Sequence, residues 1–553
     1  MIKSWKKGAV VLASIAVLAA GCGQATGQGT DSETNSNGKA DDQTLTVSVP
    51  ASLTTIDTIQ TTDKNTFTVV QHLFEGLYRL DDNSKPVPGL AAEEAEISED
   101  GKTYTFTLKE DAKWSNGEPI TAHDFVYSWT KMVTPESAAP NAYLLDSVVN
   151  GLEARTGKAS PDELGVEAVS DTEFKVKLTE PLPSFLTLIS IGWLAPQNEA
   201  YVEEQGDSYA SDSEHVLYSG PFILSNWTQG EEDWSLEKNE HYYAADEVNL
   251  TNIDFNTIKE EQTGIDLYTA QQLDLTKISG QYVDHYQNDE GFVSHNDIAN
   301  TFIDFNKEEG TPAGNVHLRK AIAYAIDKVS LVDTVLNDGA VALNGLIPNG
   351  LFQNPETGED FRAYSGDYLT HDVEKAQEEW ELAQEELGNI VEISLLSADD
   401  YTSARTAEYV QSQIQETLDG VTVKLNKQPK NNVNQSRGDS NYEMSLSGWI
   451  AGDNNLAYYF ILYEGDSSYN YGNYHNDNFD VLVTDAKTVD ANDVNQQFVD
   501  YKEAETLLIE EDAAQVPLYQ GASNYLINPE LKGIEYHLYG DYFNFRTAYL
   551  AEE

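Results

Sequence analysis

The stretch WSNGEPITAHDFVYSW, residues 114–129, is the most informative run in the chain and carries clear signals for the start of a helix. Thr121 follows Pro119 and can act as an N-cap residue. Asp124 stands three positions later, in the arrangement of a capping box. We therefore expect a helix that begins at Thr121 and runs to residue 133.

Strands of alternating polarity flank this helix in the sequence. KTYTFTLKE (102–110) places its aromatic residues and a leucine on one face and its threonines on the other, and TEFKVKLTE (172–180) has the same alternation. This pattern is typical of half-buried strands. LTVSVP, which starts at Leu45, alternates in the same way. The early part of the chain is therefore predicted to be rich in antiparallel strands.

Helical and strand patterns alternate in the later part of the chain. Apolar residues recur at helical spacing in 316–336 and 371–388. The strands VEISLLS (391–397) and VTVKLNKQ (421–428) flank a helix at 402–418. Strand–helix–strand order is typical of α/β architecture. Since 553 residues are too many for one compact core, we expect an α/β protein with two lobes.

The chain opens with MIKSWKKGAVVLASIAVLAAGC, in which lysines precede an apolar run too short to span a bilayer. This arrangement predicts a secretory signal peptide over residues 1–21. The last residues, LAAGC, resemble a bacterial lipobox, which implies that Cys22 becomes an acylated N-terminal anchor. An ordinary signal with a chance cysteine is the alternative. The polar, Gly- and Ser-rich residues that follow predict a flexible tether over residues 22–44.

The composition narrows the function classes. The formal net charge of −60 speaks against nucleic-acid binding, because phosphates need a positive surface. Cys22 is the only cysteine, so no disulfide can form within the chain. No segment after the signal reaches about 18 uninterrupted apolar residues, so we expect the mature chain to contact the lipid bilayer only through Cys22.

Signatures of catalysis are missing from the sequence, including G-x-S-x-G, H-E-x-x-H and G-x-x-x-x-G-K-[ST]. The oxygen ligands in NYHNDNFD (473–480) lack the loop spacing of an EF-hand, so we expect no metal and no cofactor. A binding protein explains the chain better than an enzyme. A surface esterase or glycosidase is the alternative, although no pair of acids stands out for that chemistry.

Several stretches resemble the extracytoplasmic solute-binding proteins of oligopeptide ABC importers, the family 5 solute-binding proteins. That family's pattern W-[SN]-[DN]-G-x-P-[VIL]-T-A-x-D-F-x-x-[SA]-W stands intact from Trp114 to Trp129. Similarity extends to SGPFILSNW (219–227), LRKAIAYAIDK (318–328) and SLSGWIAGDNNLAYYF (445–460). The resemblance covers the chain from about residue 45 to residue 550.

The resemblance implies a two-lobed flytrap like that of periplasmic binding proteins, with an extra subdomain in the first lobe. Lobe one would hold residues 45–298 and 517–553, and lobe two residues 299–516, with two crossings as the hinge. It also implies a monomer that captures oligopeptides and delivers them to an ABC permease with separate ATPase subunits. With the lipid anchor, this places the protein on the outer face of the cytoplasmic membrane of a Gram-positive bacterium.

In similar carriers, the acid that receives the peptide α-amine follows a Gly-Trp pair in a G-W-x-x-D pattern. Here Gly448 and Trp449 match, but Gly452 stands at the acid's position and Asp453 comes one place later. Either a one-residue shift lets Asp453 serve, or amine recognition is weakened or lost. Trp449 is expected to line the cleft, with packing in the core as the alternative.

Further residues fall where similar carriers line the cleft or form the first hinge strand. They are Thr62 and Lys64 in a cleft-lining segment, Tyr143 and Lys277 at ligand contacts, the cleft arginine Arg437, and Asp304 in the hinge strand. The alternatives are a surface ion pair for Arg437, and an N-cap or a hinge hydrogen bond for Asp304.

The aromatic run between Tyr442 and Tyr474 leaves the ligand class open. Its rings could stack on sugars, as in an oligosaccharide-binding protein, or pack inside a lobe. A peptide-pheromone receptor would share fold and chemistry with a general peptide carrier and differ in selectivity. Oligopeptide binding is the main hypothesis.

Overall fold

The computed structural model describes residues 38–452, 454–465 and 467–552, and the folded body is the unit Ala40–Glu553. The predicted signal peptide and Cys22 lie outside the described residues. Among the residues that are described, no helix is long and apolar enough to cross a bilayer.

Residues 40–44, which the sequence places at the end of the tether, are hydrogen-bonded to the C-terminal segment. The Ala40 amide donates to the Leu550 carbonyl over 2.9 Å, and the Gln43 side chain donates to the same carbonyl over 2.9 Å. Strand β1 (Thr44–Val49) starts directly afterwards. The ordered body therefore begins before Leu45, because a polar side chain ties down a segment that has no apolar signal.

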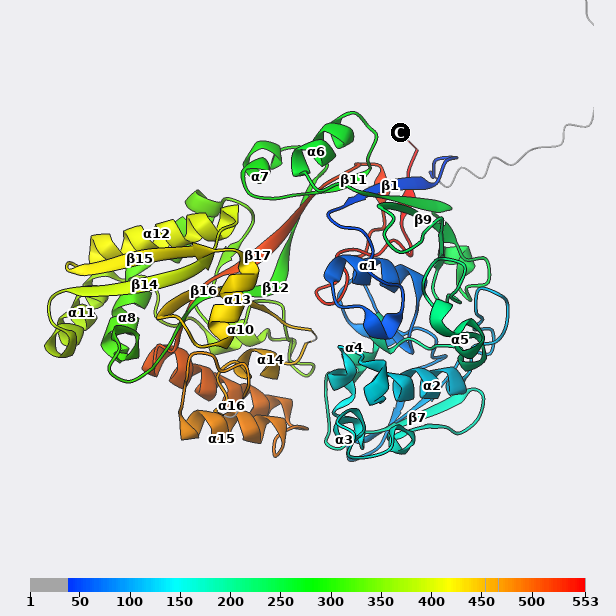
Figure 1. Cartoon of the computed structure of the whole chain (residues 1–553), viewed down its shortest axis with the longest axis horizontal. Coiled ribbons are helices and arrows are strands. Elements are labelled where there is room, and N and C mark those ends of the chain that lie inside the picture. The colour runs from blue at the N-terminus through cyan, green and yellow to red at the C-terminus, as the bar shows by residue number, and fades with distance from the viewer. Residues whose placement is uncertain (1–37, 453, 466, 553) are drawn as a thin grey trace, which may run out of the picture. The chain divides into compact units, whose positions relative to one another are not determined.

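One large mixed sheet forms the centre of the body (Figure 1). In the described part of the chain its strands follow the order β15-β14-β16-β12-β17-β11-β1-β10-β9-β8, and β13 pairs with β17. Besides β1, they are β8 (Phe222–Ser225), β9 (Asp233–Lys238), β10 (Asn252–Thr257), β11 (Leu275–Ile278), β12 (Phe292–Phe305), β13 (Val341–Ala342), β14 (Val391–Ala398), β15 (Val421–Gln428), β16 (Met444–Ile450) and β17 (Gln515–Ile527).

Strands β12 and β17 are the longest and join the two ends of this sheet. They pair antiparallel, with β16 beside β12 and β11 beside β17. In Figure 1 the two strands span the distance between β11 and β16, in opposite directions. The register between them breaks between Asn296 and Asn300 and again between Thr301 and Phe302. A bulged pair of long strands bends more easily than a regular ladder.

A separate antiparallel sheet carries the helix that follows Thr121. Its strands, in order, are β4 (Glu96–Ile97), β5 (Thr103–Thr107), β7 (Glu173–Lys177) and β6 (Val166–Ala168). Helix α2 (Ala122–Val133) packs on it, with the rings of Phe125 and Trp129 5.6 and 5.3 Å from that of Phe174. The Asp124 carboxylate accepts a hydrogen bond from the Thr121 amide over 2.7 Å. The predicted helix and both flanking strands are confirmed.

Helices cover the large sheet and connect its strands; α8 and α11 lie side by side, and α12 packs on β14 and β15 (Figure 1). The helices before β12 are α1 (Lys64–Leu73), α3 (Gly151–Arg155), α4 (Phe185–Ile189), α5 (Glu199–Gln205), α6 (Glu261–Thr269) and α7 (Gln281–Tyr286). The later helices are α8 (Val316–Ala325), α9 (Lys328–Ser330), α10 (Phe361–Ser365), α11 (Val373–Leu387), α12 (Tyr401–Thr417), α13 (Lys430–Gly438), α14 (Ala457–Phe460), α15 (Asp477–Lys487) and α16 (Val494–Glu505). Two short strand pairs complete the fold: β2 (Tyr78–Leu80) with β3 (Pro86–Pro88), and β18 (Leu531–Lys532) with β19 (Tyr549–Leu550).

The segment 316–336, which the spacing of apolar residues predicts as a helix, is interrupted. Helix α8 ends at Ala325, and Asp327 caps the next short helix by accepting a hydrogen bond from the Ser330 amide over 3.0 Å. A π-helical turn follows to Leu336. A capping aspartate inside an apolar pattern restarts the helix, because its side chain competes for backbone amides.

Buried apolar side chains form three main clusters in the described part of the chain. One draws almost entirely on residues 298–519. A second joins the segments before residue 294 to those after 524, and a third holds α2 and the small sheet. Strands and helices mix in the large sheet and its cover, so the predicted α/β class is confirmed.

Candidate ligand-binding cavity

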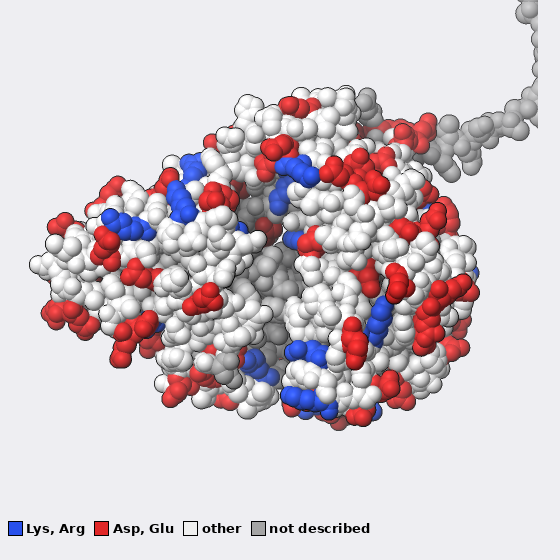
Figure 2. Space-filling view, in the orientation of Figure 1, with Lys and Arg blue, Asp and Glu red and all other residues white. Residues whose placement is uncertain are grey.

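A cavity of about 600 Å³, here called the main cavity, opens among the described residues. Its lining comes from segments far apart in the sequence: residues 62–64 and 67, residues 143 and 144, residues 188, 191 and 193, residues 449–452, residues 455, 457, 458, 461, 464 and 469, Lys487, and residues 538 and 540. Its walls are mostly apolar, and its volume falls within the usual range for ligand sites. Figure 2 shows a hollow across this face of the molecule, with several Lys and Arg side chains along its rim.

Aromatic rings from two distant segments form opposite parts of the cavity wall. The Trp449 indole donates a hydrogen bond to the Tyr458 carbonyl over 2.7 Å, and its ring lies edge-on to Tyr469 at 5.3 Å. The rings of Phe67 and Trp193 contact each other at 4.4 Å. All of these side chains line the main cavity. Fixed rings of this kind offer apolar contact area at little cost in side-chain entropy.

Strand β16 offers a backbone edge beside the cavity. One of its edges pairs with β12, where Gly448 stands opposite Thr301. On its other edge, β14 pairs only with Met444 and Ser445, and no strand in the described part of the chain pairs with residues 446–450. Gly448 is exposed, and a Cβ there would meet only the Asn300 carbonyl, at 3.2 Å. An extended ligand can form main-chain hydrogen bonds with such an edge.

Charged side chains line the main cavity in small number. Asp63 caps α1, where its carboxylate accepts hydrogen bonds from the Thr66 amide over 2.8 Å and the Thr54 hydroxyl over 3.0 Å. Glu464 and Lys487 form an ion pair at 2.5 Å. The fourth charged group is Lys64. Positive and negative groups are therefore both available to a zwitterionic ligand.

Lys64 and Lys277 share one tyrosine. Their ammonium nitrogens lie 4.4 and 4.9 Å from the centre of the Tyr542 ring, a cation–π arrangement. Burial lowers the pKa of both lysines, and the nearby Asp297 carboxylate opposes that shift. Lys64 also lines a neighbouring cavity of about 260 Å³, whose wall includes Asp297. Lys277 lines neither cavity.

Arg437 and Asp304, which the resemblance places at the cleft and hinge, point into the protein. Arg437 is buried in α13, with its guanidinium 5.2 Å from the centre of the Tyr471 ring. The Asp304 carboxylate accepts a hydrogen bond from the Tyr442 hydroxyl over 2.6 Å and lies 3.4 Å from the Lys307 ammonium. Neither residue lines the main cavity. Both side chains therefore make interior contacts within residues 304–471.

The structure brings together four of the residues that the sequence singles out: Thr62, Lys64, Tyr143 and Trp449 all line the main cavity. Gly448 lies next to it in β16. Asp453 lies outside the described residues, and its neighbour Gly452 lines the cavity. The residues that the sequence does not single out are Asp63, Phe67, Trp193, Glu464 and Lys487. No local motif marks them, because they meet only through the fold.

The aromatic run from Tyr442 to Tyr474 divides between core and cavity. Tyr458 and Tyr469 line the main cavity with Trp449. The members that are buried in hydrophobic cores are Tyr442, Tyr459, Phe460, Tyr463 and Tyr474. Most of the run therefore packs lobe two, and only a few rings are available to a ligand.

Together, the mixed sheet with its two long crossing strands and the cavity lined from distant segments define a two-lobed, flytrap-like solute-binding protein. Residues 85–471 match the family described as "Bacterial extracellular solute-binding proteins, family 5 Middle". The chain belongs to this family, whose description is that of solute-binding proteins and not of enzymes.

Relatives and solved structures agree with this assignment. The chain is 32% identical over 530 residues to the dipeptide-binding protein of Lactococcus lactis subsp. cremoris, covering 92% of this chain and 95% of that protein. The structure titled "Listeria monocytogenes OppA bound to peptide" is 34% identical, with a TM-score of 0.75 over 93% of this chain and 100% of that one. That of the pheromone receptor PrgZ is 30% identical, with a TM-score of 0.75 over 92% of this chain and 100% of that one.

Proposed function

We propose that this protein binds oligopeptides in the main cavity and delivers them to an ABC permease with separate ATPase subunits. The observation that carries the proposal is the free edge of β16 beside the cavity, in a family whose relatives include named dipeptide- and oligopeptide-binding proteins. A backbone edge recognises what all peptides share, so it permits binding without regard to sequence. Waters can complete the hydrogen bonds of varied side chains.

The ends of a peptide carry charge, and the cavity offers partners for both. The α-amine pairs with Asp453, one position after the expected acid, since Gly452 brings the chain to the cavity wall. The carboxylate pairs with a lysine, and Lys64 is the lysine at the junction with the neighbouring cavity. Charge-assisted hydrogen bonds of this kind are stronger than neutral ones.

Two lobes close on the ligand in this proposal. Lobe one holds residues 45–298 and 517–553, and lobe two residues 299–516. The separation of the hydrophobic clusters supports these bounds, and so do the register breaks where β12 and β17 cross between them. Ligand contacts made on both sides stabilise the closed form by the difference in affinity between the two states.

The mature protein is a monomer anchored through acylated Cys22 on the outer face of the cytoplasmic membrane of a Gram-positive bacterium. The lysines, short apolar run and lipobox-like LAAGC of residues 1–22 support this part of the proposal. An anchored carrier stays close to its permease while a tether leaves it free to turn.

A receptor for one peptide pheromone is the second candidate function. The structural likeness to the pheromone receptor PrgZ favours it over an oligosaccharide carrier. Sugar binding has weaker support, because most of the aromatic run is core.

Native mass spectrometry of residues 24–553, incubated with a mixture of short peptides and oligosaccharides, tests the proposal. Many bound peptide masses are expected. A single bound peptide would favour the pheromone receptor. Sugar masses alone, or no bound mass on a folded protein, would overturn peptide binding.

A further inference from the structure

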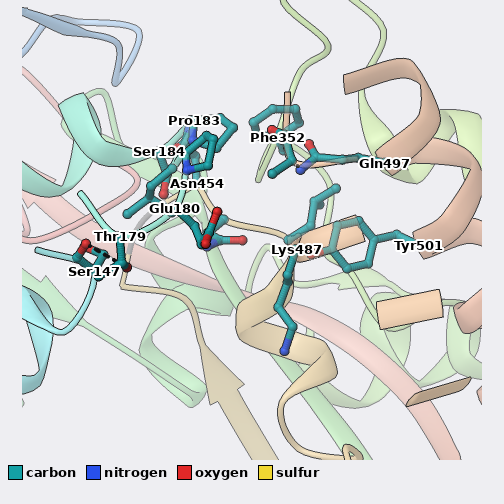
Figure 3. Close-up of a pocket in the computed structure, with 15 residues that line it drawn as sticks. Ser147, Thr179, Glu180, Pro183, Ser184, Phe352, Asn454, Lys487, Gln497 and Tyr501 are labelled. Carbon is teal, nitrogen blue, oxygen red and sulfur yellow. Dashed lines mark hydrogen bonds between the residues drawn. The ribbon is translucent and has the colours of Figure 1, made fainter. Parts of the chain in front are cut away.

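A second cavity of about 200 Å³, here called the distal pocket, adjoins the main cavity (Figure 3). One side comes from Ser147 and residues 179–184, beside the small antiparallel sheet. The other side comes from Phe352 and from residues 454–456 and 487–501. Asn455 and Lys487 line both cavities, so the two spaces meet at these residues.

The walls of the distal pocket are mostly apolar. They are built from Leu182, Pro183, Phe352, Leu456 and Tyr501. Tyr501 is buried, and its ring packs at 4.7 Å on that of Phe460 in the core. The Phe352 ring lies 5.9 Å from that of Phe498. The pocket therefore rests on rings held by the core of lobe two, which makes it a preformed apolar site.

In the described part of the chain, three residues that line the distal pocket carry buried polar atoms without partners. Ser184 is only 2% exposed, and its hydroxyl has no hydrogen-bond partner among the described residues. The same holds, within that part of the chain, for the hydroxyl of Ser147 and the side-chain oxygen of Asn454. Ser184 belongs to the first side of the pocket and Asn454 to the other, so both sides carry such an atom. A buried polar group without a partner costs free energy, so three in one pocket point to a ligand that supplies the partners.

The charges at the junction of the two cavities are already compensated. Lys487 contributes its aliphatic stem to the distal pocket, and Figure 3 shows its ammonium group pointing away from Ser184 and Asn454. That ammonium group pairs at 2.5 Å with Glu464, which lines the main cavity. The chain of a ligand can pass this neutral pair without burying an unpaired charge.

We propose that the distal pocket is a further subsite of the same ligand, which rests on the proposed function of the main cavity. An extended peptide bound along β16 continues past Lys487 and places an apolar side chain between Leu182, Phe352 and Tyr501. Its peptide groups satisfy Ser184, which can donate or accept, and Asn454, whose oxygen accepts an N–H. A dipeptide fills the main cavity only, so the ligand class is longer oligopeptides with an apolar distal residue.

A variant that fills the distal pocket tests this inference. Thr179 lines the pocket at an exposed position, so Thr179→Trp can occlude it without disturbing the core. Thr107→Trp is the matched control, because Thr107 is exposed on the neighbouring strand β5 and lines neither cavity. Affinity is measured by calorimetry for random dipeptides and for random hexapeptides that end in phenylalanine.

The wild type and Thr107→Trp are expected to bind hexapeptides more tightly than dipeptides. Thr179→Trp should weaken hexapeptide binding by about tenfold or more, the effect of a lost apolar contact of a buried side chain, and leave dipeptide binding unchanged. Ser184→Ala should weaken hexapeptide binding alone, by about threefold to tenfold, as expected for one lost hydrogen bond.

Each other outcome overturns the inference. If Thr179→Trp binds hexapeptides like the wild type, or loses both lengths equally, the distal pocket is not a separate subsite. Tight dipeptide binding with no gain for hexapeptides has the same meaning, and the proposed function survives in all three cases. If neither length binds to the folded wild type, the proposed function itself fails, and the inference with it.

Discussion

Trp449 is fixed by the hydrogen bond from its indole nitrogen to the Tyr458 carbonyl, so it presents one face to the main cavity. Lys64 is positioned by a cation–π contact with the Tyr542 ring. The first side chain gives shape to the site and the second gives charge. At the scale of single residues, the proposal assigns the peptide amine to Asp453.

Asp453→Asn tests the acid that stands one position late. If Asp453 holds the α-amine, the variant loses a charge-assisted hydrogen bond and peptide affinity falls by about 1.5–3 kcal/mol in calorimetry. An N-acetylated peptide is the control, since it lacks the charge and should bind wild type and variant alike. An unchanged dissociation constant for the free peptide would assign the amine to another residue, such as Glu464.

Lys328 gives a pH-dependent prediction about stability. It is 3% exposed, donates to the Asn344 side-chain oxygen over 2.9 Å, and burial lowers its pKa to about 7. In the unfolded chain the pKa of a lysine is about 10.4, so between these values the unfolded state binds the extra proton. The free energy of unfolding therefore rises with pH across this window.

Lys328→Met removes this ionisation. We compare the free energy of unfolding of the variant with that of wild type by urea unfolding at several pH values. The difference, variant minus wild type, should be most positive near pH 6. It should fall by about 3 kcal/mol or more toward pH 10. The exposed Lys430→Met is the matched control and should show little such change. A difference that does not vary with pH would mean that Lys328 stays charged in the folded protein.

At the scale of elements, the side chain of Gln520 bridges the break between β12 and β17. The amide of Gln520, which is 2% exposed, donates to the Asp297 and Asn349 carbonyls, both over 2.9 Å. Its oxygen accepts from the Asn349 amide over 3.1 Å. The irregular part of the hinge is therefore satisfied by a buried glutamine where the ladder provides no bonds.

Gln520→Leu should destabilise the protein by about 1–3 kcal/mol, because it leaves part-buried backbone groups of Asp297 and Asn349 without partners. Thermal unfolding measures the loss. Gln520→Glu places a buried carboxylate against the Asp297 and Asn349 carbonyl oxygens, so at neutral pH it should destabilise the protein at least as much. Stability equal to wild type in the leucine variant would show that the break relaxes without Gln520.

Local signals in the sequence predicted elements well. Thr121 and Asp124 predicted where α2 begins, and alternation predicted β5 and β7. Asp327 broke the expected helix at 316–336, because a capping side chain overrode the apolar spacing. Residues 40–44 joined the body through hydrogen bonds to Leu550, a contact across almost the whole chain that no local pattern encodes.

The site was predictable only in part, because contacts between residues far apart in the sequence also shape it. Trp449 came from the Gly-Trp pair and Tyr143 from its matching position in similar carriers, and both line the main cavity. Arg437 matched a position but points toward Tyr471 in the interior. Trp193 and Lys487 belong to no motif and reach the cavity only because distant segments meet there. Orientation of a side chain depends on its neighbours in space, which one sequence does not state.

At the scale of the whole molecule, the two crossing strands imply motion of one lobe against the other. Ligand contacts on both lobes should shift the population toward a closed, more compact form. Small-angle scattering with and without a bound peptide is expected to show a smaller radius of gyration in the complex. No compaction at saturating peptide would mean that binding and closure are separate.

Hydrogen–deuterium exchange with and without a mixture of peptides tests the central claim most directly, because it reports both sides of the cavity at once. Peptide should slow exchange at residues 446–452, where main-chain hydrogen bonds to β16 form, and at residues 62–67 on the opposite wall. Protection at both segments is the predicted result. Protection at only one of them, or at neither while peptide is bound, would contradict a ligand enclosed between the two lobes.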